Sequence, residues 1–80
     1  MAVAILEEAA RGAADDVASR AQAALRKSPI YPLRDLDVEL VGRKLIISGS
    51  VKTFYQKQLA QEVVRNVGAN LQVVNEVRVD

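Results

Sequence analysis

The 80-residue sequence predicts an α+β fold, an αββαβ two-layer sandwich in which the helices pack on one face of a three-stranded mixed sheet. Three observations predict it. Apolar residues recur every three or four positions over residues 15–27 and 53–67, the period of amphipathic helices. They alternate with polar residues over 36–41, 44–51 and 71–79, the period of half-buried strands. Half of the residues are hydrophobic but only three are aromatic, which predicts a small, mainly aliphatic core.

The start of the chain predicts an extension to a single domain. Residues 1–14 are rich in alanine and contain Gly12. This composition is compatible with either a helical or a disordered segment. The domain itself is expected over 15–80, and the chain is too short for a second one. No stretch reaches the ~20 apolar residues of a membrane span. No secretory signal is expected, because Glu7 and Glu8 end the first apolar run. A longer, exported parent protein stays possible.

The first helix is expected from about Asp15 to Lys27. Its apolar stripe is mostly alanine, which allows a close approach to its partner. Ser28-Pro29 ends it, because proline disfavours helical geometry in the residue before it. Residues 28–34 contain two prolines and predict a loop. The large apolar residues of this loop are Ile30, Tyr31 and Leu33.

A hairpin over residues 36–51 has a predicted register. Gly42 and Arg43 fit a two-residue type II′ turn, in which glycine supplies the positive φ of the first central position. Gly42 is therefore a structural position, and the turn sets Val41 opposite Lys44. The inward positions then pair as Leu40 with Leu45, Val38 with Ile47, and Leu36 with Gly49. A slip of one residue would turn every inward side chain outward.

The second helix is expected to begin after Thr53, which has capping-box spacing to Gln56. Its apolar stripe predicts that Tyr55 belongs to the core. Gly68 follows the last apolar residue and predicts a left-handed cap, a second structural glycine.

The last strand is expected over residues 71–79. Because the preceding helix makes a right-handed crossover, this strand should run parallel to strand 44–51, which becomes the centre of the sheet. Gly49 is interpreted as structural, leaving room for a helix or for the Asn75 side chain. Asn75 is expected to pin a neighbouring loop, since a buried amide needs hydrogen-bond partners. The alternative for this pair is a small polar niche for a ligand.

Composition excludes several functions. Without Cys or His the chain has no disulfide, no thiolate or imidazole metal site, no Cys nucleophile and no Ser-His-Asp triad. Eleven basic and ten acidic residues give a formal net charge of +1, so no global attraction to nucleic acid is expected. We assign no catalytic residue, metal ligand or cofactor, and we do not expect an enzyme.

One strand face is acidic. Asp35, Asp37 and Glu39 could converge on calcium, but no loop is present to wrap the ion, and a face turned to water is expected. These carboxylates could also form a glycosidase-type acid/base pair, but nothing in the sequence indicates the cleft that such an active site needs. The exposed sheet face contains no aromatic ring, which argues against RNA binding by stacking, and the chain has no Gly-x-x-Gly clamp.

Cations and aromatic residues are expected to gather at one end of the domain. Lys52 and Lys57 lie near Phe54 in the sequence, and Tyr31 comes from the proline-containing loop. Amphipathic aromatic rings beside cations favour a lipid interface. The edge of an ordinary core would have the same composition. Tyr31, Lys52, Phe54 and Lys57 are therefore candidates for contact with lipid or with a partner.

Two segments support a family resemblance, Leu45-Ile46-Ile47-Ser48-Gly49-Ser50-Val51 and Val73-Val74-Asn75-Glu76-Val77-Arg78-Val79. Shorter matches are Ala24-Leu25, Leu36-Asp37-Val38 and Gln58-Leu59-Ala60. Together they make residues 24–79 resemble a BON domain (bacterial OsmY and nodulation domain). Members usually carry Gly-Val before the last strand, where this chain has Gly68-Ala69-Asn70-Leu71.

The resemblance implies the same αββαβ sandwich. It also implies a non-catalytic module, often exported, that is associated with the periplasm or cell envelope, osmotic stress and phospholipid binding. The leading hypothesis is a module that contacts phospholipid surfaces or envelope proteins. The alternative is a structural protein–protein interaction module in a larger chain or homo-oligomer, because the outer strands of a three-stranded sheet have unpaired edges. The oligomeric state is left open.

Overall fold

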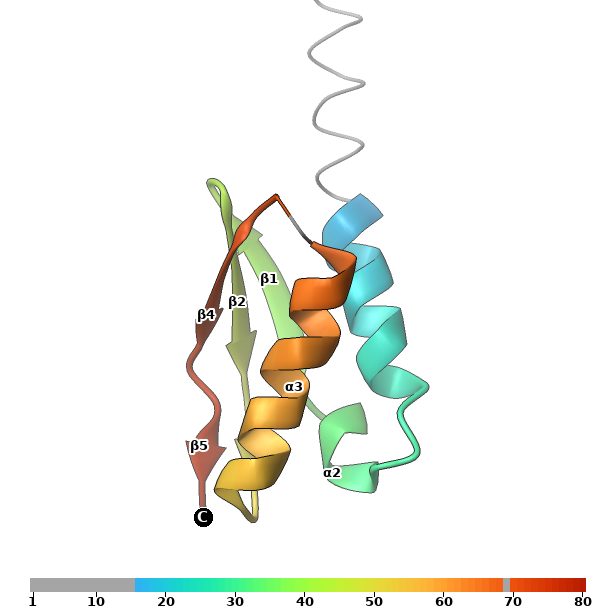
Figure 1. Ribbon diagram of the computed structural model, residues 1–80, viewed down its shortest axis with the longest axis vertical. Helices are drawn as coiled ribbons and strands as arrows, with labels where there is room; N and C mark the ends of the chain where they lie inside the picture. The colour runs from blue at the N-terminus through green and yellow to red at the C-terminus, as the bar shows by residue number, and fades with distance from the viewer. Residues whose placement is uncertain (1–15, 69) are drawn as a thin grey trace, which may run out of the picture.

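Two helices lie on one face of a mixed sheet in the computed structural model, which describes residues 16–68 and 70–80 (Figure 1). The first helix covers residues 16–26. The elements after it are α2 (Tyr31–Arg34), β1 (Asp37–Val41), β2 (Lys44–Ser48), β3 (Ser50–Val51), α3 (Phe54–Val67), β4 (Gln72–Asn75) and β5 (Arg78–Val79). The predicted α+β sandwich is confirmed. The extension expected over residues 1–14 lies outside the described residues.

The hairpin has the predicted register. β1 and β2 are antiparallel, with Val41 opposite Lys44, and the inward pairs are Leu40–Leu45 and Val38–Ile47. Gly42 has a φ of +63°. Among the described residues only glycines have a positive φ, so Arg43 does not. This combination fits the type II′ turn, in which only the first central residue needs a positive φ.

The sheet is mixed, and its central strand is the predicted one. β2 pairs parallel with β4, and β3 pairs parallel with β5. Each of the long strands expected over 44–51 and 71–79 is nevertheless in two pieces. The ladder continues through the interruption, because Glu76 N–H donates to the Ile47 carbonyl and Arg78 N–H to the Gly49 carbonyl, both at 2.9 Å. The sheet therefore bends at Gly49, where φ is +123°, and does not end there.

Gly49 makes room for a different neighbour from those expected. A Cβ at this position would lie 2.7 Å from Cδ2 of Leu36, which is buried. The space is therefore filled by the residue predicted to face Gly49 across the hairpin. The interpretation that a helix or the Asn75 side chain fills it is wrong.

Asn75 connects the sheet to a helix. Its Nδ2 donates to the Lys57 carbonyl at 2.9 Å and to Oε1 of Gln61 at 3.3 Å, both on α3. Its Oδ1 accepts the Val77 N–H at 3.2 Å, where β4 gives way to β5. A neighbouring loop was expected as its partner, but Asn75 instead bonds to α3 and to its own chain two residues on.

The segment expected to be a loop contains the one-turn helix α2. Proline is accepted in a first helical turn, because its missing N–H would have no partner there. Pro32 takes such a position, and Leu33 is buried beneath the turn. The prolines therefore shape this helix as well as the connection before it.

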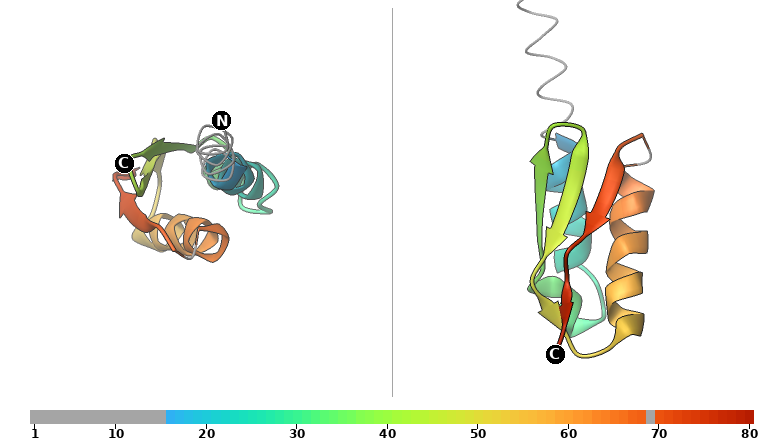
Figure 2. Two further views of the ribbon diagram at one scale, coloured as in Figure 1. Left: turned by 90° about the horizontal axis from the view of Figure 1, so that it is seen from above. Right: turned by 90° about the vertical axis from the view of Figure 1, so that its left-hand side faces the viewer.

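The core residues come from both the sheet and the helices, the two layers seen in Figure 2. The core is aliphatic, as predicted, and no aromatic ring belongs to it. Its buried residues are Ala21, Leu25, Leu33, Leu36, Leu45, Ile47, Val51, Ala60, Val64 and Val77.

Two expectations for α3 are wrong. Tyr55 is 69% exposed, because α3 buries the side that carries Ala60 and Val64. Positions four apart rotate by about 40° per step around a helix, so the predicted stripe moves off the buried side before it reaches Tyr55. Gly68 does not form a left-handed cap, since its φ is −108°. A Cβ there would lie 2.5 Å from Cδ1 of Leu45, so this glycine allows close packing.

Candidate functional site

The candidate site lies at one end of the molecule, the lower end in Figure 1, where four segments meet. They are α2, the end of β3 with the turn to α3, the first turn of α3, and the end of β5. α2 contacts both β3 and α3. Segments far apart in the sequence are thus gathered on one surface.

All three aromatic side chains project from this end. The exposed fractions are 72% for Tyr31, 76% for Phe54 and 69% for Tyr55. We call the surface formed by these three residues and Lys52 the aromatic end. Three of the four large hydrophobic residues that are exposed in the described chain therefore lie at this end; the fourth is Val41.

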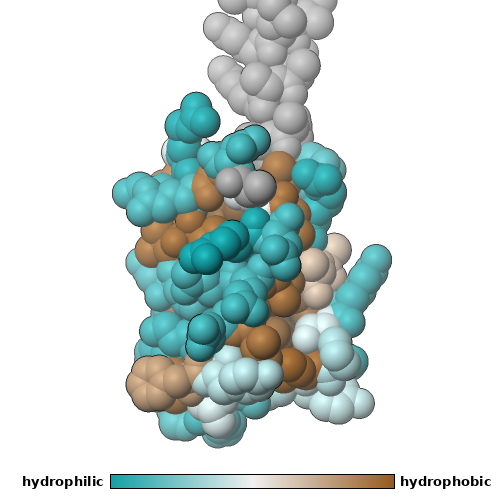
Figure 3. Space-filling view, viewed as in Figure 1, coloured by the Kyte–Doolittle hydropathy of each residue, from teal (hydrophilic) through white to brown (hydrophobic). Residues whose placement is uncertain are grey.

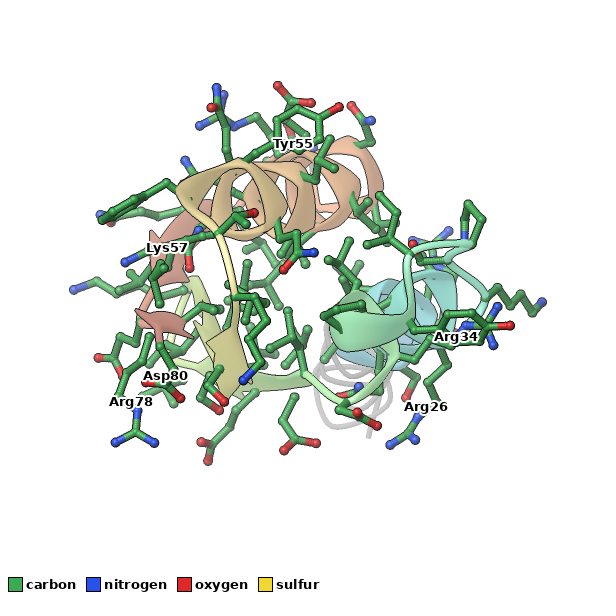
Figure 4. All side chains as sticks on the ribbon, turned by 90° about the horizontal axis from the view of Figure 1, so that it is seen from below. Arg26, Arg34, Tyr55, Lys57, Arg78 and Asp80 are labelled. Atoms are coloured by element: carbon green, nitrogen blue, oxygen red, sulfur yellow. The ribbon has the colours of Figure 1, made fainter. Side chains whose placement is uncertain are left out.

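Two side-chain bonds at the start of α3 set the direction of Phe54 and Tyr55. They are the Thr53 cap and a bond from the N–H of Lys52, not of Thr53 as in a standard capping box, to Gln56. Oγ1 of Thr53 accepts the Gln56 N–H at 3.1 Å, and Oε1 of Gln56 accepts the Lys52 N–H at 3.0 Å. These bonds fix the start of α3, so the two aromatic residues occupy its first turn. Figure 4 views the molecule from this end and shows Tyr55 directed away from the sheet.

A cation holds the ring of Tyr31. The guanidinium carbon of Arg34 lies 4.3 Å from the centre of that ring. Nε of Arg34 also donates to the Ser28 carbonyl at 2.6 Å, which fixes the guanidinium in place. Arg34 lies in the loop expected near this end, but it was not among the predicted contact residues. The spacing of three between Tyr31 and Arg34 was the available signal, but it indicates a contact only in a helical segment.

Lys52 and Tyr31 meet at a surface hollow of about 290 Å³. Its lining residues are Tyr31, Pro32, Asp35, Ser50, Val51, Lys52 and Asp80. One ammonium group and the side chains of two aspartates therefore share this hollow. The structure brings Tyr31 and Lys52 together, and it adds Asp35, which was predicted to belong to the acidic strand face, and Asp80, which was given no role.

Lys57 lies at the margin of this surface. It follows Phe54 by three residues, so the two are neighbours on α3. It lies on the opposite side of the helix from Tyr55, toward β5, and is half-buried. Its carbonyl accepts the bond from Asn75. The four candidate residues therefore do not form one cluster.

The surface has no metal cluster in the part of the chain that the structure describes. Among those residues, no group of three or more Asp or Glu side chains is placed to hold a metal ion. Asp37 and Glu39 are exposed on β1, as expected for acidic side chains turned to water, whereas Asp35 ends α2 and lines the hollow with Lys52. Figure 3 shows hydrophobic side chains reaching the surface near the lower end.

Within residues 16–68 and 70–80, no helix has the length and apolarity needed to cross a membrane.

Comparison with known proteins gives one finding. A family model, BON domain, matches residues 13–80. The match includes the segment 68–71, where the sequence departs from the usual Gly-Val. A search of curated proteins finds no match.

Proposed function

Because this chain belongs to the BON domain family, we propose that it is a non-catalytic module that binds phospholipid surfaces of the cell envelope through its aromatic end. The observation that carries the proposal is the exposure of Tyr31, Phe54 and Tyr55 at one end. Aromatic rings partition into the interface between lipid headgroups and acyl chains. A small number of shallow anchors predicts weak, reversible binding.

The charges of the aromatic end indicate which lipids it accepts. Lys52 and Arg34 attract phosphate groups, but Asp35 and Asp80 share the same hollow as Lys52. These carboxylates offset the attraction to an anionic surface. The rings therefore supply most of the binding free energy, and neutral and anionic vesicles should bind to similar extents.

A double variant tests the proposal. Phe54→Ser combined with Tyr55→Ser should weaken binding to phospholipid vesicles roughly tenfold, because two apolar anchors are lost. Co-sedimentation with neutral and with anionic vesicles measures this. Val41→Ser is the matched control, since Val41 is 48% exposed but lies beside the hairpin turn, away from the aromatic end.

Two results would contradict the proposal. The first is an absence of binding to either vesicle at low salt. The second is equal binding by the double variant and the wild type. Either would favour the alternative of a protein-interaction module, which the open sheet face supports, because Ile46 and Val74 are only half-buried there.

A further inference from the structure

Each outer edge of the sheet is bonded by a side-chain carboxamide, Gln22 on one edge and Asn75 on the other. On the β1 edge, Nε2 of Gln22 donates to the Leu36 carbonyl at 2.6 Å, and its Oε1 accepts the Val38 N–H at 2.8 Å. On the opposite edge, Oδ1 of Asn75 accepts the Val77 N–H. A carboxamide has the donor and acceptor of a peptide group. Gln22 therefore makes the two bonds that a neighbouring strand would make.

The geometry of the hairpin explains why Gln22 meets these atoms. A two-residue turn makes its flanking residues a hydrogen-bonded pair, so the odd-numbered residues of β1 turn their peptide groups toward β2. The even-numbered residues, Leu36, Val38 and Leu40, turn theirs outward. Gln22 covers the Leu36 carbonyl and the Val38 amide. The Val38 carbonyl and the Leu40 amide continue the same edge beyond its bonds.

The two edges differ in how firmly the carboxamide is held. Asn75 also donates to Lys57 and Gln61, so displacing it would break two hydrogen bonds between the sheet and α3. The Gln22 carboxamide bonds only to the β1 edge within the described residues. A change of its side-chain torsions would uncover that edge without breaking any other hydrogen bond described for Gln22. β1 is therefore the edge that can open.

A shallow hollow of about 370 Å³ lies between helix 16–26 and Val38. Its lining residues are Ala18, Ser19, Gln22, Ala23, Arg26 and Val38. Most of the helix residues here are small, so side chains of an added strand can lie against them.

The negative charges on β1 favour a partner strand that carries positive charges. Asp37 and Glu39 are exposed on the open face of the sheet. If a second copy paired antiparallel about Val38, Asp37 of one chain would face Glu39 of the other, and like charges directly opposite are destabilising. A strand with Lys or Arg at alternate positions would instead meet both carboxylates favourably.

We propose that the outer edge of β1 is a strand-pairing surface that Gln22 keeps covered, and that its partner is an extended segment of another protein with basic residues at alternate positions. The partner strand displaces the Gln22 carboxamide and takes over its bonds. Main-chain bonds then supply affinity, and Asp37 and Glu39 supply selectivity.

The test uses the 80-residue chain, its Gln22→Ala variant and a short synthetic peptide of alternating Val and Lys. Gln22→Ala should bind this peptide about tenfold more tightly than the wild type, since the internal competitor is gone. NMR titration should show the largest changes at the Val38 and Leu40 amides. Gln58→Ala is the matched control, because it removes an exposed carboxamide from α3 and should bind as the wild type does.

Two further peptides separate strand pairing from charge. A peptide of alternating Val and Glu should not bind, and one of Val and Lys with a central proline should bind much more weakly, because proline removes a main-chain donor. If Gln22→Ala does not fold, Gln22→Asn replaces it, since its shorter side chain cannot span both edge groups.

Three results would overturn the proposal. One is equal affinity of the Gln22 and Gln58 variants for the Val and Lys peptide. Another is equal binding of the proline-containing peptide, which would indicate attraction by charge alone. The third is self-association of Gln22→Ala in the absence of peptide, which would make a second copy the occupant.

Discussion

Gly42 and Gly49 both have positive φ angles but serve different purposes. A Cβ on Gly42 would meet nothing within 4 Å. A Cβ on Gly49 would lie 2.7 Å from Cδ2 and 3.5 Å from Cα of Leu36. Gly42 is therefore required for backbone conformation alone, whereas Gly49 is required for conformation and for space.

Alanine substitutions should separate the two requirements. Gly49→Ala is expected to lower the free energy of unfolding by about 2–4 kcal/mol, because it adds backbone strain and displaces a buried leucine. Gly42→Ala adds strain alone and should lower it by about 1 kcal/mol. Urea denaturation followed by circular dichroism measures both losses. Equal losses would show that the contact with Leu36 carries no weight.

At the level of elements, the two ends of α3 are specified differently. Its beginning depends on a local signal, the Thr53 cap on the Gln56 N–H and the Gln56 bond to the Lys52 N–H. Its end depends on packing, because Gly68 is needed where α3 approaches Leu45 of the sheet and Val17 of the first helix. A sequence pattern can predict the first of these, since all its atoms lie within five consecutive residues. The second requires knowledge of which elements meet.

The Thr53 cap should contribute modestly to the free energy of unfolding, and a serine variant can distinguish the cap from the threonine methyl group. Thr53→Ala should lower the free energy of unfolding by about 1 kcal/mol, because the Gln56 N–H loses its acceptor. Thr53→Ser keeps a hydroxyl and should remain close to the wild type. Thermal or urea unfolding of the three proteins checks this. A serine variant as unstable as the alanine variant would mean that the threonine methyl group, and not the cap, stabilises this turn.

Considered as a whole, the molecule has two unlike ends. The hairpin turn occupies one end, and the aromatic rings with α2 occupy the other. Between them lies a core whose described members all come from residues 21–77. The family match over residues 13–80 agrees with our proposal that the folded domain spans residues 15–80, with residues 1–14 as an extension.

Removal of residues 1–14 should therefore leave the domain folded. A chain that begins at Asp15 is expected to unfold cooperatively, with a Tm within about 5 °C of the full chain, because the described core is intact. Far-UV circular dichroism during heating measures this. Loss of cooperative unfolding would show that the extension is part of the domain.

The hairpin register and the aliphatic core could be predicted from the sequence because they depend on short-range rules. A two-residue turn with glycine first leaves one register in which every inward side chain meets another. The α3 stripe was less informative. A repeat of four drifts around the helix, so the pattern does not show which part of the stripe faces the core, and Tyr55 was placed wrongly.

The candidate site and the sheet edges depend on contacts between distant parts of the chain. Tyr31 and Lys52 share a hollow because α2 packs against β3, and Gln22 reaches Val38 across sixteen residues of sequence. No periodic pattern marks a helix glutamine as the partner of a strand edge. Local patterning determines which segments are helix or strand and which strand register forms. Which side chains remain exposed, and which edge stays covered, is decided only when the layers pack, because burial and edge bonding belong to pairs of elements.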